Sequence, residues 1–179
     1  MPWDEVDARL LEHSVSRLRD MLIGQQLDIS ERRNGDRIVR LPKPAGADYA
    51  FELWIYGPDS GGSGGRHIGA TLPGRSDTET FWGCPFEPES FFRTRKTTWT
   101  EARERLADAF DEMVRDIVRL PTRIIQSRGL LHWRFTLQVE TLPGSWKSVC
   151  SSILLRLGFR VAPIQGRMRV YASPAIAAN

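Results

Sequence analysis

A chain of 179 residues, of which 41% are apolar, is long enough to bury its own core. It contains no run of 18 apolar residues and no signal-peptide pattern, so we expect a cytoplasmic protein that does not interact with membranes. The formal net charge is +3, and the two cysteines form no C-x-x-C motif, so a disulfide framework is not expected. The three histidines have no metal-ligand spacing and there is no dinucleotide fingerprint, so neither a metal nor another cofactor is expected.

Charge is distributed unevenly along the chain. Residues 121–179 contain eight basic residues and one acidic residue, whereas residues 1–120 contain 17 basic and 21 acidic residues. Of the 25 basic residues only three are lysine, and an arginine bias suits recognition of phosphate or carboxylate. The codon usage of a GC-rich, bacterial-like genome gives the same bias, and we favour that interpretation.

A helix and a hairpin are predicted at the N-terminus. Asp4 is placed to cap a helix that ends near Ile23 and has leucine and valine at helical spacing. Residues 27–41 form a hairpin around Asn34-Gly35. A three-residue loop would pair Ile29 with Leu41 and keep the apolar side chains on one face.

Two further strands, residues 49–56 and 66–72, flank a glycine-rich loop. The preferred register sets Ile55 opposite Ile68 and Trp54 over Gly69, while registers shifted by two residues remain open. In each case Trp54, Tyr56 and His67 share one face. These three residues are a candidate platform for a partner. The interpretation that we favour is that a helix of the same chain covers this face, which would also account for its aromatic residues.

Residues 79–92 combine aromatic residues with proline and are predicted to form an irregular loop. We include its Trp82 and Phe86 among the tentative partner-binding residues, although packing of the loop onto the core is the simpler expectation. Cys84 with His67 or His132 as a base would make a hydrolase, but no local motif supports that chemistry.

The clearest element is the helix Thr98–Leu120. Thr98 and Glu101 have the spacing of a capping box, and Pro121 ends the helix. Leu106, Phe110, Met113, Ile117 and Leu120 recur at steps of three and four, which places them on one buried stripe.

The C-terminal third is predicted to hold two strands (122–126 and 131–140), a helix (145–157) and a hairpin (159–163 with 167–171). Residues 173–179 are expected to be a frayed tail. In the last hairpin Met168 and Val170 would point inward. Outward-pointing basic and aromatic residues would then form a polyanion-binding face: Arg134, Arg160, Arg167, Arg169 and Tyr171. The alternative, which the sequence leaves equally open, is that this surface packs against the acidic side of the helix Thr98–Leu120.

The predicted fold is a single α+β domain spanning residues 1–179. It has two layers, with a mainly antiparallel sheet packed against amphipathic helices. No catalytic residue or metal ligand can be assigned. The function that fits best is a non-enzymatic protein-interaction module: a small adaptor, chaperone or immunity-type inhibitor with an unknown protein partner. The alternative is binding of nucleic acid or another polyanion through the basic C-terminal third, and a Cys/His hydrolase is the weakest hypothesis.

Overall fold

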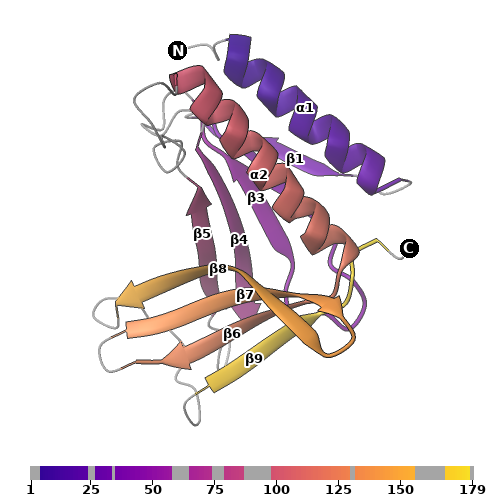
Figure 1. Cartoon of the computed structure of the whole chain (residues 1–179), viewed down its shortest axis with the longest axis vertical. Helices are drawn as coiled ribbons and strands as arrows, with labels where there is room; N and C mark the ends of the chain where they lie inside the picture. The colour runs from indigo at the N-terminus through magenta and orange to yellow at the C-terminus, as the bar shows by residue number, and fades with distance from the viewer. Residues whose placement is uncertain are drawn as a thin grey trace. The chain divides into compact units, whose positions relative to one another are not determined.

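A computed structural model of the chain describes residues 5–23, 27–33, 35–57, 65–73, 79–86, 98–129, 132–155 and 168–177. Two α-helices and nine strands in two antiparallel sheets occur in these residues, which confirms a mixed α+β protein (Figure 1). Within the same residues, no helix is long and apolar enough to cross a membrane.

The first sheet is a meander with the strand order β1-β2-β3-β4-β5. The N-terminal elements are α1 (Glu5–Met21), β1 (Asp28–Glu31), β2 (Arg37–Arg40), β3 (Phe51–Ile55), β4 (Arg66–Pro73) and β5 (Glu79–Phe86). The second sheet has the order β8-β7-β6-β9. It follows α2 (Trp99–Arg119) and consists of β6 (Thr122–Arg128), β7 (His132–Leu142), β8 (Ser145–Leu155) and β9 (Met168–Ser173).

The chain divides into two compact units. The first contains Met1–Leu41, Glu52–Ile68 and Pro85–Arg115, and the second contains Pro42–Phe51, Gly69–Cys84 and Asp116–Asn179. The first core includes Leu18, Val39, Leu53, Ile68, Leu106 and Phe110. The second core includes Tyr49, Leu72, Ile124, Phe135, Leu137 and Val139.

The α2 helix confirms the strongest sequence prediction. The N–H of Thr98 donates to Oε2 of Glu101 (2.8 Å), and the N–H of Glu101 donates to Oγ1 of Thr98 (3.2 Å). These two bonds form the capping box. The backbone N–H of Thr98 lowers the pKa of the Glu101 carboxyl, because the hydrogen bond that it donates favours the charged form. On the predicted stripe, Leu106, Phe110 and Ile117 are buried, whereas Met113 and Leu120 are only half-buried.

The first hairpin has a different register from the predicted one. Ile29 lies opposite Val39 rather than Leu41, and five residues connect the strands. The shift is two residues, so the predicted face is unchanged. The N–H of Arg32 also donates to the carbonyl of Asp36 (2.9 Å), so the backbone pairing continues one residue pair beyond the two strands. The buried carboxylate of Asp36 accepts a hydrogen bond from the N–H of Gly57 (2.9 Å).

The expected irregular loop at residues 79–92 is a strand over its first part, because β5 spans Glu79–Phe86. The aromatic residues that suggested a packed loop also favour strands. Pro85 is tolerated because β5 is an edge strand, where a missing N–H need not remove a ladder hydrogen bond. Residues 87–92 lie outside the described part of the chain.

The predicted helix at residues 145–157 is wrong over its described part, which is strand β8 paired along β7. Gly144, with φ of 78°, makes the preceding turn a hairpin rather than a helix start. A register shift between Leu137 and Gln138 inserts one extra residue in β8. Trp146 and Ile153 therefore share a face of the strand although they are seven residues apart. Seven residues is also about two turns of a helix, so the same two positions fit the predicted helix.

Strand β9 differs from prediction in its partner and its orientation. It pairs with β6, and residues 159–163, its expected partner, lie outside the described residues. Met168 and Val170 are exposed, whereas Tyr171 is 2% exposed. The expected inward and outward faces are thus exchanged.

Residues 173–177 are held by hydrogen bonds and are not frayed. Ser173 is buried at the end of β9. The N–H groups of Ile176 and Ala177 both donate to the carbonyl of Val118, at 2.9 and 3.0 Å.

Candidate functional site

One face of the second sheet, here named the outer face, has three cross-strand rows that follow from the strand registers. From β9 to β8 they are Met168, Ser127, Arg134 and Ile153; Val170, Ile125, Thr136 and Ser151; and Ala172, Arg123, Gln138 and Ser148. On the opposite, inner face of β7 the side chains of Trp133, Phe135, Leu137 and Val139 are buried. The sheet therefore has one covered and one accessible side.

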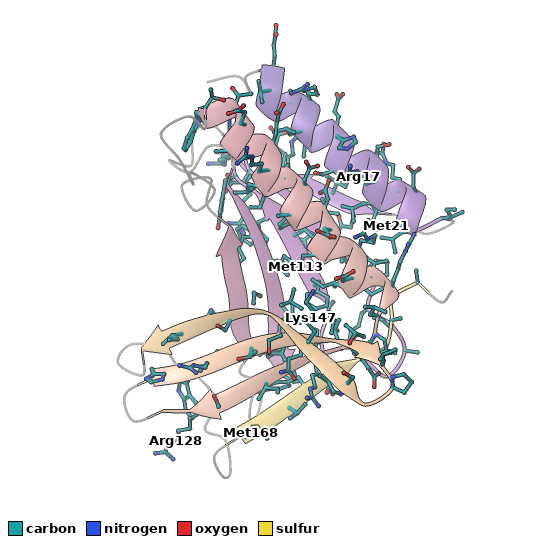
Figure 2. All side chains as sticks on the ribbon, in the orientation of Figure 1. Arg17, Met21, Met113, Arg128, Lys147 and Met168 are labelled. Carbon is teal, nitrogen blue, oxygen red and sulfur yellow. The ribbon has the colours of Figure 1, made fainter. Side chains whose placement is uncertain are left out.

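The outer face exposes large apolar side chains. Ile153 is 56% exposed, Met168 58% and Val170 45%. Figure 2 labels Met168 at the start of β9. The other large apolar residues that are exposed in the described chain are Ile23, Trp99 and Leu142. Met168 and Val170 are close together on β9, whereas Ile153 is on β8 at the other end of the row, with Ser127 and Arg134 between them.

A polar network crosses the same face. The guanidinium of Arg123 lies 4.1 Å from the ring centroid of Trp146, and its Nε donates to Oε1 of Gln138 (2.8 Å). The amide of Gln138 in turn donates to Oγ of Ser148 (3.0 Å). Arg134 is exposed, and the three rows contain no acidic residue. A fourth pair on this face is Glu140 with Trp146, so the outer face carries one carboxylate besides Arg123 and Arg134 and is apolar at its margins.

The residues of the predicted polyanion face do not come together in the described structure. Arg134 is on the outer face, whereas Arg169 and Tyr171 are on the inner face, where they pair with Gln126 and Ile124. The Arg169 guanidinium lies 4.9 Å from the Tyr171 ring centroid. The Tyr171 hydroxyl donates to Oε1 of buried Gln126 (2.9 Å). Arg160 and Arg167 lie outside the described residues.

The candidate aromatic platform is brought together in the first unit. The His67 ring lies 6.1 Å from the Trp54 ring, and its Nδ1 is 2.9 Å from the Tyr56 hydroxyl. The N–H of Tyr56 donates to the carbonyl of Gly65 (3.1 Å). This bond fits a register shifted by two residues from the preferred one, with Trp54 beside His67 instead of Gly69.

The platform is half-buried. Burial lowers the pKa of His67, because it disfavours the charged imidazolium. The Arg32 guanidinium covers the Trp54 ring at 4.2 Å from its centroid. The side chains of Trp82, Cys84 and Phe86 lie outside the described residues, so their expected roles in partner binding or hydrolysis stay predictions.

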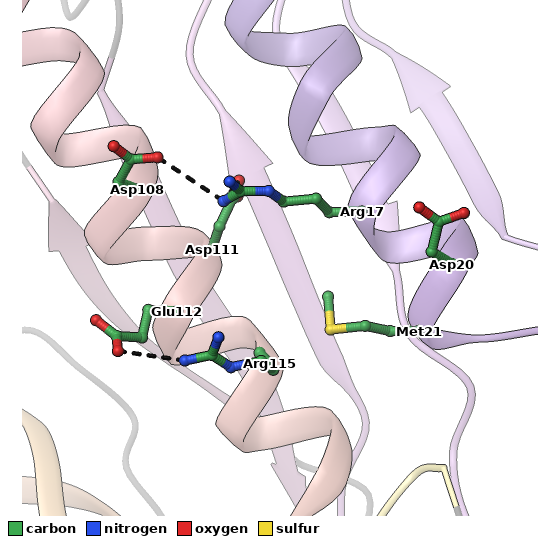
Figure 3. Close-up of a pocket in the computed structure, with 7 residues that line it drawn as sticks. All are labelled: Arg17, Asp20, Met21, Asp108, Asp111, Glu112 and Arg115. Carbon is green, nitrogen blue, oxygen red and sulfur yellow. Dashed lines mark hydrogen bonds and ion pairs between the residues drawn. The ribbon is translucent and has the colours of Figure 1, made fainter.

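A cleft of about 460 Å³ lies between α1 and α2 (Figure 3). Its lining is mainly charged: Arg17, Asp20, Asp108, Asp111, Glu112 and Arg115. Arg17 bridges to Asp111 (3.2 Å) and Asp108 (3.8 Å). Burial raises the pKa of Asp111, and the Ser14 hydroxyl and Arg17 oppose that effect. Sequence analysis did not identify this cleft, whose ion pairs join the two helices.

Comparison with protein-family models, curated proteins and solved structures found no match. In the described residues, no group of three or more His, Cys, Asp or Glu side chains is arranged to hold a metal ion.

Proposed function

We propose that the chain is a non-enzymatic protein-interaction module and that its partner binds the outer face of the second sheet. The observation that carries this proposal is the joint exposure of Ile153, Met168 and Val170 on that face. Burial of these side chains against a partner would be favourable by the hydrophobic effect. An adaptor, a chaperone or an immunity-type inhibitor would use such a surface.

A protein partner suits this face better than a polyanion. Arg134 lies beside Ile153, and the face adds hydroxyl groups rather than further exposed cations. Arg169 and Tyr171, which a phosphate-binding face would need, are on the inner side. Nucleic-acid binding remains the alternative, and its strong dependence on salt separates it from apolar association.

We also infer the two-layer arrangement within the first unit, with the amphipathic helices against its sheet. This arrangement is supported by two buried residues of opposite charge, one on a helix and one on a strand. Asp111 of α2 and Arg66 of β4 are both buried, and Arg66 acts electrostatically to lower the pKa of Asp111. Such buried opposite charges are expected to be close.

The test is quantitative capture of binding proteins from nuclease-treated extract of the native host. The outer-face variant carries Ile153→Ser, Met168→Ser and Val170→Thr. The matched control is Leu142→Ser, which removes an exposed apolar side chain at the β7–β8 turn. We expect the outer-face variant to lose the proteins that the wild type and the control enrich, with an unchanged melting temperature. Equal enrichment by all three proteins would contradict the proposal.

A further inference from the structure

Among the described strands, β9 lies at the edge of the second sheet, with β6 as its neighbour. Ala172 directs its N–H and its carbonyl away from β6, because both bond to Asp48 (2.7 and 2.8 Å). Backbone direction alternates along a strand, so the same groups of Val170 and Met168 also point outward. In the part of the chain that the structure describes, no strand pairs with β9 on that side.

Asp48 occupies at Ala172 the position that a residue of a further strand would take. Its backbone N–H donates to the Ala172 carbonyl, as a paired strand residue's would, and its side-chain carboxylate accepts from the Ala172 N–H. The opposite edge of the sheet is protected differently, because β8 carries exposed Lys147 and a register shift, two features that hinder pairing. Strand β9 is therefore the edge suited to accept a strand.

We propose that β9 binds an extended segment of the partner protein as an additional strand, whose side chains alternate between apolar and acidic. This inference rests on the proposed function and specifies its binding mode. Backbone groups of Met168 and Val170 supply the hydrogen bonds, as in other strand additions.

The alternation follows from the two sides of β9. Side chains of an added strand lie beside those of β9 on the same face. On the outer side the neighbours are Met168 and Val170, which favour apolar residues. On the inner side the neighbour is the half-buried Arg169, which favours a carboxylate. An alternating apolar and acidic segment therefore complements both sides.

The test uses the full chain labelled with ¹⁵N and two short synthetic peptides, one alternating valine with glutamate and one alternating valine with lysine. Amide hydrogen exchange is followed by NMR. We expect the glutamate peptide to slow exchange at Met168 and Val170, while Arg169 and Tyr171, which already pair with β6, change little. Val170→Pro removes one outward N–H without removing a bond to β6, and should weaken binding about tenfold. Arg169→Gln should remove the preference for glutamate over lysine.

Each contrary outcome has a separate meaning. Equal binding of both peptides would overturn the acidic preference. Peptide binding without new amide protection, but abolished by Ile153→Ser, would overturn strand addition and leave outer-face binding intact. Protection that grows with protein concentration in the absence of peptide would identify a second copy of the chain as the occupant instead. Absence of peptide binding would overturn strand addition, while the capture experiment decides the proposed function independently.

Discussion

Truncation of Phe110 tests the core of the first unit. Phe110 is 1% exposed in the middle of α2, so Phe110→Ala removes a fully buried aromatic ring. Loss of burial alone costs about 1.5–3 kcal/mol. The cavity left behind raises the expected loss of unfolding free energy to about 3–5 kcal/mol. Urea denaturation followed by circular dichroism measures it.

The matched control is Glu112→Ala on the same helix. The Glu112 side chain is 70% exposed and pairs with Arg115 at 3.2 Å. Exposed ion pairs contribute little, so the unfolding free energy should change by less than about 0.5 kcal/mol. A loss below about 1 kcal/mol for Phe110→Ala would refute the burial of this helix face.

Three further changes test other parts of the structure. Tyr171→Phe leaves the buried side-chain carbonyl of Gln126 without its hydrogen bond and should lower the unfolding free energy by about 1–3 kcal/mol. Thermal unfolding measures this loss, and an unchanged melting temperature would rule out the hydrogen bond. Gly144→Ala forces alanine to φ of 78° and should cost about 1 kcal/mol, with a smaller loss for Gly144→Asn; equal stability of all three would contradict the turn geometry. Burial raises the pKa of Asp111 in the folded protein above its ordinary value of 3.8, so the folded protein binds this proton more tightly than the unfolded chain does. The unfolding free energy should therefore fall as the pH rises from 3.8 to above the pKa of the folded protein. Asp111→Asn should flatten the urea-measured profile in that pH window, and an unaltered profile would contradict the assignment.

The elements that were predicted correctly have local sequence patterns that fit only one type of secondary structure. The α2 helix combines a capping box with a single apolar stripe, and β7 alternates without interruption from Trp133 to Val139. In both, the local pattern agrees with the burial that tertiary packing requires.

The misassigned elements have patterns that depend on distant partners. The apolar spacing in β8 matches a helix, and the bulge opposite Leu137 and Gln138 that fits it to a strand exists only in the paired sheet. In β9, apolar or aromatic residues occur at both alternating positions, so the pattern cannot orient the strand. The hydrogen bond from Tyr171 to Gln126, 45 residues away, is found on its inward side.

The outer face was missed for the same reason. The sequence predicts Met168 and Val170 to point inward, because apolar side chains usually lie in the core. Their register with β6 places them on the accessible side. By contrast, proximity of Trp54, Tyr56 and His67 could be predicted, since strand parity alone puts them on one face.

The most direct test of outer-face binding is site-specific photo-crosslinking in the native host. A photoreactive phenylalanine derivative replaces Ile153 or Met168 on the outer face, and Glu112 on α2 as the exposed control position. Outer-face binding predicts the same partner adduct from both outer-face positions and none from position 112. An adduct from position 112 alone, or none from either sheet position, would contradict it.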